Sequence, residues 1–309
     1  FLRYPDAHNA DAPFDKEWID KMLPVDKYIG GAEHACMHLL YARFFTKALR
    51  DMGYLDFDEP FLSLVHQGTI LGPDGNKMSK SRGNVVSPDD SIAKYGADIF
   101  RVYLMFGFNY VEGGPWNDNG LDSISRFFDR VERIVKKCYE VNFDNKPLGK
   151  AEKELNRVRH NTIKCVTNDL GVFSFNTAVA RLMEYVNAIY AYETNVEKKN
   201  VFYKDCAKDL VLLIAPFAPH FAEELWEMLG EKYSVFNQPY PKFDPSAMVL
   251  DEIELAVQIN SKMRAKITVP SGASKDEIEK TAIEAVKDQL QGVPKKVIVV
   301  PGRLVNIIA

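Results

Sequence analysis

Between Asp122 and Leu229, apolar residues recur every three or four positions over segments too long to be strands. This spacing places them on one face of an amphipathic helix, which must be buried against another element. The clearest segment, Asp122–Glu140, has its apolar residues at Ile124, Phe127, Phe128, Val131, Ile134, Val135 and Cys138. Further helices are predicted over Ala151–Leu170, from Ser174 onwards, over Tyr203–Ala215 and over Pro219–Leu229. The middle of the chain is therefore predicted to be a bundle of four or five helices.

The pattern differs on either side of this bundle. Before it, a predicted helix over Glu33–Asp51, a strand over Leu62–Leu71 and a capped helix start at Ser87 alternate as in an α/β region. After a linker rich in proline and aromatic residues, strand and helix patterns return, with a helix over Ser274–Leu290. We predict a multi-domain chain with a partial α/β nucleotide-binding (Rossmann-like) region at 1–118, an α-helical bundle at 119–232, a linker at 233–249 and a small α+β domain at 250–309.

The composition excludes several classes of protein. With 46% hydrophobic and 27% charged residues, the chain has the composition of an ordinary globular protein. No run approaches the ~20 apolar residues of a membrane helix, and no signal-peptide pattern opens the chain, so no membrane association is predicted. The cysteines form no Cys-x-x-Cys pair, which indicates a reducing, cytoplasmic compartment. The net charge of −4 argues against a general nucleic-acid coat but permits local basic surfaces.

The most informative stretch is Lys77-Met78-Ser79-Lys80-Ser81, which follows a predicted strand and precedes a capped helix. A lysine ammonium on a long stem can follow phosphate oxygens, and fixed cations stabilise the charge that develops when phosphoryl groups react. The two serines can donate hydrogen bonds to phosphate or stabilise the loop. The alternative is a solvated surface loop, but the whole pentapeptide in this setting favours phosphate binding.

A second candidate segment starts at Gly30-Gly31 and includes Glu33, His34 and His38. Glycines let a ligand approach the backbone at a helix N-terminus, where Glu33 can accept a hydrogen bond from a ribose hydroxyl. On one continuous helix, His34 and His38 would share a face. They could bind zinc, lie in the core or line a substrate pocket. Because the His-Glu-x-x-His order and further ligands are missing, no metal site is predicted.

These motifs resemble a known family. Lys-Met-Ser-Lys-Ser resembles the signature loop of class I aminoacyl-tRNA synthetases, and Gly-Gly-x-Glu-His-x-x-x-His is similar to a segment of leucyl-tRNA synthetases. The resemblance implies that Lys77 and Lys80 are catalytic, stabilising the ATP triphosphate during adenylate formation, and that His34 and His38 shape the leucine pocket. It implies ATP-binding roles for Gly30, Gly31, Glu33, Gln67, Gly68, Lys77, Met78, Ser79, Lys80 and Ser81. Mg²⁺ is implied together with ATP, without a dedicated protein site.

The C-terminal segments Val257–Ile267 and Val299–Asn306 are similar to the tail domain of bacterial leucyl enzymes. The resemblance implies contacts of the bundle and tail with tRNA(Leu). The candidate tRNA-binding residues are Arg126, Arg130, Arg133, Lys262, Arg264 and Lys266. The last three alternate, so on a regular strand they would project from one side. A solvated polar face is the alternative for the helical arginines.

The sequence departs from the family in two ways. Only Gly72–Asn76 separate the predicted strand from Lys77, where many bacterial leucyl enzymes insert a domain, and there is no His-Ile-Gly-His motif. In the family that motif holds the other side of ATP. We therefore predict that the chain, which starts at Phe1 without Met, is the C-terminal half of a monomeric leucyl-tRNA synthetase and does not activate leucine alone. The alternatives are a stand-alone tRNA-binding module or a related synthetase for valine, isoleucine or methionine.

Overall fold

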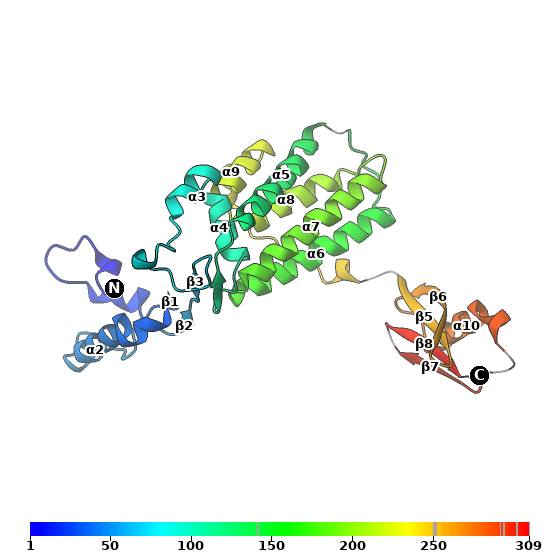
Figure 1. Cartoon of the computed structure of the whole chain (residues 1–309), viewed down its shortest axis with the longest axis horizontal. Helices are drawn as coiled ribbons and strands as arrows, with labels where there is room; N and C mark the ends of the chain where they lie inside the picture. The colour runs from blue at the N-terminus through cyan, green and yellow to red at the C-terminus, as the bar shows by residue number, and fades with distance from the viewer. Residues whose placement is uncertain (141, 250–251, 291, 293, 301, 309) are drawn as a thin grey trace. The chain divides into compact units, whose positions relative to one another are not determined.

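A computed structural model describes residues 1–140, 142–249, 252–290, 292, 294–300 and 302–308 (Figure 1). The chain forms two compact units. The first consists of Phe1–Asn142, Cys165–Asn187 and Tyr203–Pro241, and the second of Phe143–Lys164, Ala188–Phe202 and Lys242–Ala309. Among the described residues, no helix has the length and apolar character needed to cross a membrane.

Two short pairs of parallel strands organise the first part of unit one. β1 (Tyr28–Gly30) pairs with β2 (Leu64–His66), and β3 (Thr69–Leu71) pairs with β4 (Gly113–Pro115). The single strand predicted over Leu62–Leu71 is therefore two strands, interrupted at Gln67 and Gly68. The interruption lets each half of the segment pair with a different partner strand.

Two glycines make that arrangement possible. A Cβ at Gly68 would lie 2.0 Å from the backbone nitrogen of Gly113, which no side chain tolerates. Gly113 itself has φ +74°, and a Cβ there would lie 2.1 Å from the carbonyl oxygen of Thr69. Gly68 also donates its N–H to the carbonyl of Tyr110, at 2.8 Å. The chain segments thus cross in backbone contact, which only glycine permits at these positions.

The helical elements before β2 are η1 (Tyr4–Asp6), α1 (Lys16–Met22), η2 (Ala32–Cys36) and α2 (His38–Asp51). The one helix predicted over Glu33–Asp51 is thus a 3₁₀ turn followed by an α-helix. Met37 separates them with φ −119° and ψ −105°, outside the helical region. The prediction that His34 and His38 share one helical face is therefore wrong, because the i, i+4 relation holds only along an unbroken α-helix.

The segment after β3 contains η3 (Lys80–Arg82), α3 (Pro88–Tyr95) and α4 (Ala97–Phe106). The predicted helix start at Ser87 is confirmed, since its hydroxyl accepts the N–H of Asp89 at 3.3 Å. α4 then joins this region to the helices that follow. Asp98 accepts the N–H of Phe221 at 2.6 Å, and Arg101 donates to the carbonyl of Phe217 at 3.3 Å.

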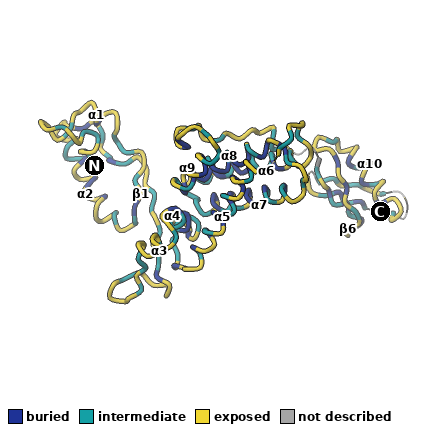
Figure 2. Tube along the Cα trace, turned by 90° about the horizontal axis from the view of Figure 1, so that it is seen from above, coloured by how far each residue is buried: buried dark blue, intermediate teal, exposed yellow. Residues whose placement is uncertain are grey.

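The predicted helical bundle is confirmed as α5 (Asn119–Glu140), α6 (Lys150–Gly171), α7 (Phe175–Asn195), α8 (Phe202–Ile214) and α9 (Pro219–Met228). Every apolar residue of the stripe predicted on α5 is buried. In unit one, the rings of Phe128 and Phe221 stack at 4.3 Å, and the hydroxyl of Tyr203 donates to the carbonyl of Ile134 at 3.3 Å. Figure 2 shows buried positions concentrated along these helices. The 3₁₀ turn η4 (Val235–Asn237) follows α9.

Unit two contains the predicted small α+β fold. Its sheet has the order β6-β5-β8-β7, built from β5 (Glu252–Ile259), β6 (Lys262–Pro270), β7 (Lys296–Val300) and β8 (Leu304–Ile308). The central pair β5–β8 is parallel and both outer pairs are antiparallel. α10 (Lys275–Ala285) begins at Ser274, which forms a capping box with Glu277, and buries Ile278 and Ala282 against the sheet. The turns η5 (Ser246–Met248) and η6 (Lys287–Gln289) also belong to unit two.

Candidate functional site

The carboxyl ends of β1 and β2 bring several predicted residues together. Gly30 lies opposite His66 in the parallel register, and the N–H of Gln67 donates to the carbonyl of Gly30 at 3.0 Å. Gly31 and Glu33 follow β1, and Gly68 follows β2, so these residues lie at the same end of the strand pair. Ligands of open α/β sheets bind in this position, outside the carboxyl ends of parallel strands.

Glu33 folds back over Gly31. A Cβ added at Gly31 would lie 2.3 Å from Oε2 of Glu33, so the carboxylate rests against the bare α-carbon. Glu33 is exposed, whereas Gly30 is buried beside the ring of Tyr28. The arrangement offers an exposed carboxylate acceptor next to a segment of backbone that a ligand can approach closely.

His38, at the start of α2, belongs to an aromatic cluster. Its Nδ1 lies 3.1 Å from the hydroxyl oxygen of Tyr28, and the two rings stack with centroids 5.5 Å apart. The ring of Phe61 lies 4.7 Å from that of Tyr28 and 6.2 Å from that of His38. Tyr28 and Phe61 are not among the residues predicted from the sequence, although Tyr28 lies only two residues before Gly30. The cluster is an apolar surface with polar groups at Tyr28 and His38.

Two further histidines carry unsatisfied polar atoms. The Nδ1 atoms of His34 and His66 are buried and have no hydrogen-bond partner in the described part of the chain. Such atoms are costly to bury unless a ligand or water satisfies them. His66 ends β2 opposite Gly30, so both histidines belong to the edge where the predicted ligand contacts gather. His66 is not among the residues predicted from the sequence, because its position opposite Gly30 depends on how the strands pair.

The signature loop leaves the end of β3. The backbone of Lys77 forms an isolated antiparallel β-bridge with that of Leu71. The hydroxyl oxygens of Ser79 and Ser81 lie 2.9 Å apart. Lys77 and Lys80 are exposed, and no described acidic side chain lies within ion-pair distance of either. Met78 is half-buried. Both ammonium groups are thus available to an anion. In the described residues, no hydrogen bond, ion pair or ring contact joins this loop to the segment from Tyr28 to His38.

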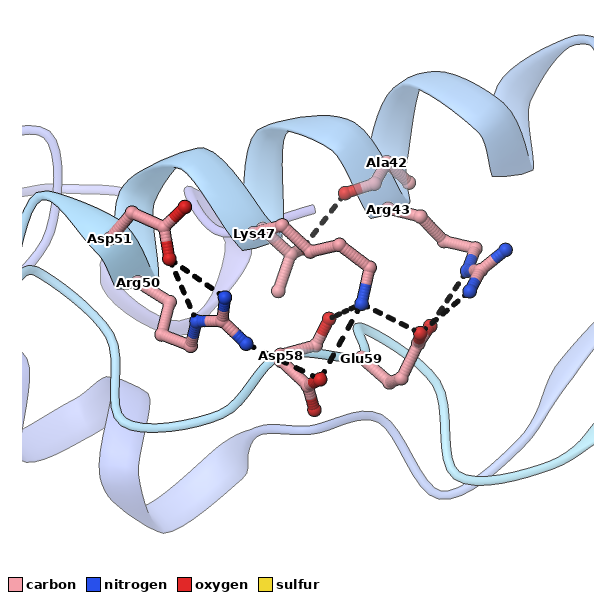
Figure 3. A network of polar contacts seen from close by, with 8 residues as sticks. Ala42, Arg43, Lys47, Arg50, Asp51, Asp58 and Glu59 are labelled. Atoms are coloured by element: carbon pink, nitrogen blue, oxygen red, sulfur yellow. Dashed lines mark hydrogen bonds and ion pairs between the residues drawn. The ribbon is translucent and has the colours of Figure 1, made fainter.

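A network of charges anchors α2 beside the site (Figure 3). Arg43 makes two hydrogen bonds to the Glu59 carboxylate, at 2.8 and 2.7 Å, and Lys47 adds a third at 2.9 Å. These donors lower the pKa of Glu59 to about 2, mainly through Arg43. Arg50 bridges Asp51 at 2.7 Å and Asp58 at 3.3 Å. The network attaches α2 to the loop that leads into β2. It therefore helps to fix the position of α2 relative to β2.

The predicted tRNA-binding residues differ in their surroundings. On α5, Arg126 and Arg133 are exposed, whereas Arg130 is half-buried and donates to Asn187 at 2.8 Å. The three candidates on β6 are exposed. However, the register of β6 with β5 shifts at Arg264, between Val257 and Gln258 of β5. This irregularity interrupts the strict alternation of side chains along β6. The prediction that Lys262, Arg264 and Lys266 project from one side of the strand therefore no longer follows. Lys266 also pairs with Glu254 at 2.6 Å.

Comparison with known proteins relates these features to a family. Residues 7–113 match the family model of class I tRNA synthetases for isoleucine, leucine, methionine and valine, and residues 152–281 match that of the anticodon-binding domain of tRNA ligases. The whole chain aligns with leucine–tRNA ligase of Caldanaerobacter subterraneus at 61% identity and with that of Clostridium kluyveri at 58%. Over its whole length the chain is therefore homologous to one part of the leucine–tRNA ligases of class I. It spans 39% of the length of these relatives.

Solved structures agree with this assignment to the leucine–tRNA ligases. The chain matches the Agrobacterium radiobacter K84 leucyl enzyme, crystallised as a ternary complex with tRNA and LeuAMS, with a TM-score of 0.81 and 34% identity. The match covers 100% of this chain and 40% of that one. A methionyl-tRNA synthetase of Mycobacterium tuberculosis bound by methionyl-adenylate matches with a TM-score of 0.61 at 17% identity, over 80% of this chain and 50% of that one. The second likeness shows a shared class I fold.

Proposed function

We propose that the chain is the part of a leucine–tRNA ligase that carries the signature loop and tRNA-binding surfaces. The complete enzyme joins leucine to ATP, releasing pyrophosphate and forming leucyl-adenylate, and then transfers the leucyl group to tRNA(Leu), releasing AMP. The observation that carries this proposal is the pair of exposed lysines, Lys77 and Lys80, in the loop that follows β3, in a chain 61% identical to a leucine–tRNA ligase. That identity favours leucine over valine, isoleucine or methionine.

The proposed chemistry is electrostatic and positional. Lys77 and Lys80 stabilise the negative charge that builds up on the triphosphate as the leucine carboxylate attacks the α-phosphorus. Glu33 accepts from the ribose, and Gly30, Gly31, Gln67 and Gly68 present their backbone to the nucleotide. His34 and His38, with Tyr28, shape the leucine pocket. In the described residues, no group of three or more His, Cys, Asp or Glu side chains gathers as a candidate metal site. Mg²⁺ is proposed to arrive bound to ATP.

Replacing Lys80 tests this function in the complete enzyme. We expect Lys80→Ala to lower the kcat of leucine-dependent ATP–pyrophosphate exchange by about 100-fold or more, the size typical of losing one preorganised charge at a transition state. Lys21→Ala, which removes an exposed lysine of α1, is the matched control and should leave exchange unchanged. An active Lys80→Ala enzyme would contradict the proposal.

Residues 1–309 by themselves are proposed to lack adenylate formation but to retain tRNA binding. The sequence has no His-Ile-Gly-His motif, whereas residues 152–281 match an anticodon-binding domain. Phosphate contacts from Arg126, Arg133, Lys262 and Arg264 predict tRNA affinity that falls steeply with salt. Filter binding at 50 and 200 mM salt, with and without ATP, measures this. Exchange activity of this chain alone, or absence of tRNA binding at low salt, would contradict this division of roles.

The proposal extends to setting and assembly. The four cysteines form no Cys-x-x-Cys pair, which fits a reducing compartment, and we propose that the enzyme is a cytoplasmic monomer. Analytical ultracentrifugation of the complete enzyme tests the second statement, because a monomer gives one species whose mass does not change with concentration.

A further inference from the structure

The side chains of Asp74 and Asn84, which lie outside the five-residue motif, form hydrogen bonds that connect the two ends of the signature loop. Asn84 donates its amide N–H groups to Oδ1 and Oδ2 of Asp74, at 3.0 and 3.2 Å, and to the carbonyl of Lys77 at 3.3 Å. Its Oδ1 accepts the backbone N–H of Ser79 at 2.9 Å. One asparagine therefore contacts the backbone of the first lysine and of the residue immediately before the second. We call the Asp74–Asn84 pair and these backbone contacts the clasp.

Asp74 is itself fixed on the other side of the clasp. Its Oδ1 accepts the N–H of Asn76 at 3.1 Å, and the Gly72 N–H donates to the carbonyl of Asn76 at 2.7 Å. The hydrogen bond from Asn84 is the main cause that lowers the pKa of Asp74, so this residue stays a carboxylate at neutral pH.

The end of β3 is shaped to admit the clasp. Gly72 is buried, and a Cβ there would lie 2.8 Å from Oδ1 of Asp74 and 2.9 Å from both Nδ2 and the carbonyl oxygen of Asn84. A larger residue would push the two side chains away from the strand end. The backbone at the base of the loop thus leaves room for Asp74 and Asn84 to meet.

The clasp also leaves the lysines free. An aspartate three residues before Lys77 is a candidate to neutralise one of the motif lysines. Asp74 instead accepts from Asn84 and Asn76, and in the described residues it forms no ion pair with Lys77 or Lys80. The carboxylate is thus used to fix the loop, while both ammonium groups remain unpaired.

We propose that Asp74 and Asn84 are positioning residues that hold the loop backbone in one conformation, so that Lys77 and Lys80 reach the triphosphate with a fixed spacing. The proposal rests on the proposed function, since it acts through the two lysines. The clasp touches no reacting atom. Its loss should impair transition-state stabilisation more than ATP binding, because small displacements of catalytic groups mainly affect the chemical step.

The kinetic test uses the complete enzyme and leucine-dependent ATP–pyrophosphate exchange. Asn84→Ala removes the donors and the acceptor, and we expect kcat to fall about 10- to 100-fold while the KM for ATP changes less than about 3-fold. Asp74→Asn keeps an acceptor oxygen and should remain within about 3-fold of the wild type, whereas Asp74→Ala should behave like Asn84→Ala. Asp89→Ala, which removes an exposed acid of α3 that does not contact the clasp, is the matched control.

A structural readout accompanies the kinetics. Amide hydrogen exchange at Ser79 should accelerate in Asn84→Ala, which removes its acceptor, and stay near the wild-type rate in Asp74→Asn. Unchanged kcat in Asn84→Ala, or reduced kcat with unchanged exchange at Ser79, would overturn the clasp. If Lys80→Ala lowers kcat but Asn84→Ala does not, the clasp alone fails. If Lys80→Ala leaves kcat unchanged, the proposed function fails and the clasp fails with it.

Discussion

Helices α2 and α5 are both amphipathic, but they are held in different ways. On α5, eight apolar residues are buried, and Phe128 is 6% exposed. On α2, only Leu39, Ala42 and Thr46 are buried, and Phe44 is 65% exposed. Figure 2 shows the same contrast between the two regions. Within residues 1–309, the bundle is therefore stabilised by apolar packing, whereas charge pairs, backbone crossings and the clasp hold the region around the candidate site.

The largest expected effect lies in the bundle. Phe128→Ala removes a buried ring that stacks on Phe221, and we expect it to lower the free energy of unfolding by about 3–5 kcal/mol through lost burial and the cavity left behind. Urea unfolding of the bundle, followed by far-ultraviolet circular dichroism, measures this loss. Phe128→Leu retains most of the apolar volume and should lose much less. A loss below about 1 kcal/mol for the alanine variant would show that the bundle does not depend on this packing.

The next effect tests backbone contact in the site region. Gly113→Ala places a Cβ 2.1 Å from the carbonyl oxygen of Thr69 and forces a positive φ on a non-glycine residue. Gly53→Ala is the control, because Gly53 also has a positive φ but no atom within 4 Å of the added Cβ. We expect about 1–2 kcal/mol of destabilisation for Gly53→Ala, from conformation alone, and a larger loss for Gly113→Ala. Thermal unfolding measures both losses of stability. If Gly113→Ala and Gly53→Ala lost the same free energy of unfolding, the backbone contact between Gly113 and Thr69 would not contribute to stability.

The bundle was predictable from sequence, whereas the site region was only partly so. The α5 stripe follows from a period that repeats over many residues, and the helix start at Ser87 follows from local capping chemistry. The break at Met37 has no such signal, because its backbone angles depend on how the chain leaves β1. The crossing of Gly68 and Gly113 and the meeting of Asp74 with Asn84 depend on tertiary placement. The residues of the motifs could therefore be predicted from the sequence, but the contacts that hold them in place could not.

A smaller effect concerns the charges that anchor α2. The pKa of Glu59 is about 2 in the folded chain against 4.5 in its ordinary state, so its stabilising contribution is complete above pH 4.5 and is lost as pH falls toward 2. Because the groups are exposed, we expect this contribution to be about 1 kcal/mol or less. Hydrogen exchange of α2 amides should therefore be faster in Glu59→Gln than in wild type at pH 6, and the difference should shrink at pH 3. Glu17→Gln, in an exposed ion pair of α1, is the control and should leave α2 unchanged.

The smallest change in the free energy of unfolding is expected for an aromatic ring that is exposed to solvent. Phe44→Ala on α2 removes the same atoms as Phe128→Ala on α5, but from a side chain that solvent already reaches. Little apolar area is lost from the interior and no cavity forms, so the free energy of unfolding should change by less than about 0.5 kcal/mol. Hydrogen exchange of α2 amides measures the local effect and urea unfolding the global one. If Phe44→Ala destabilised the chain as much as Phe128→Ala, exposed rings would have to stabilise α2 in solution, and the distinction between a packed bundle and a charge-anchored site region would fail.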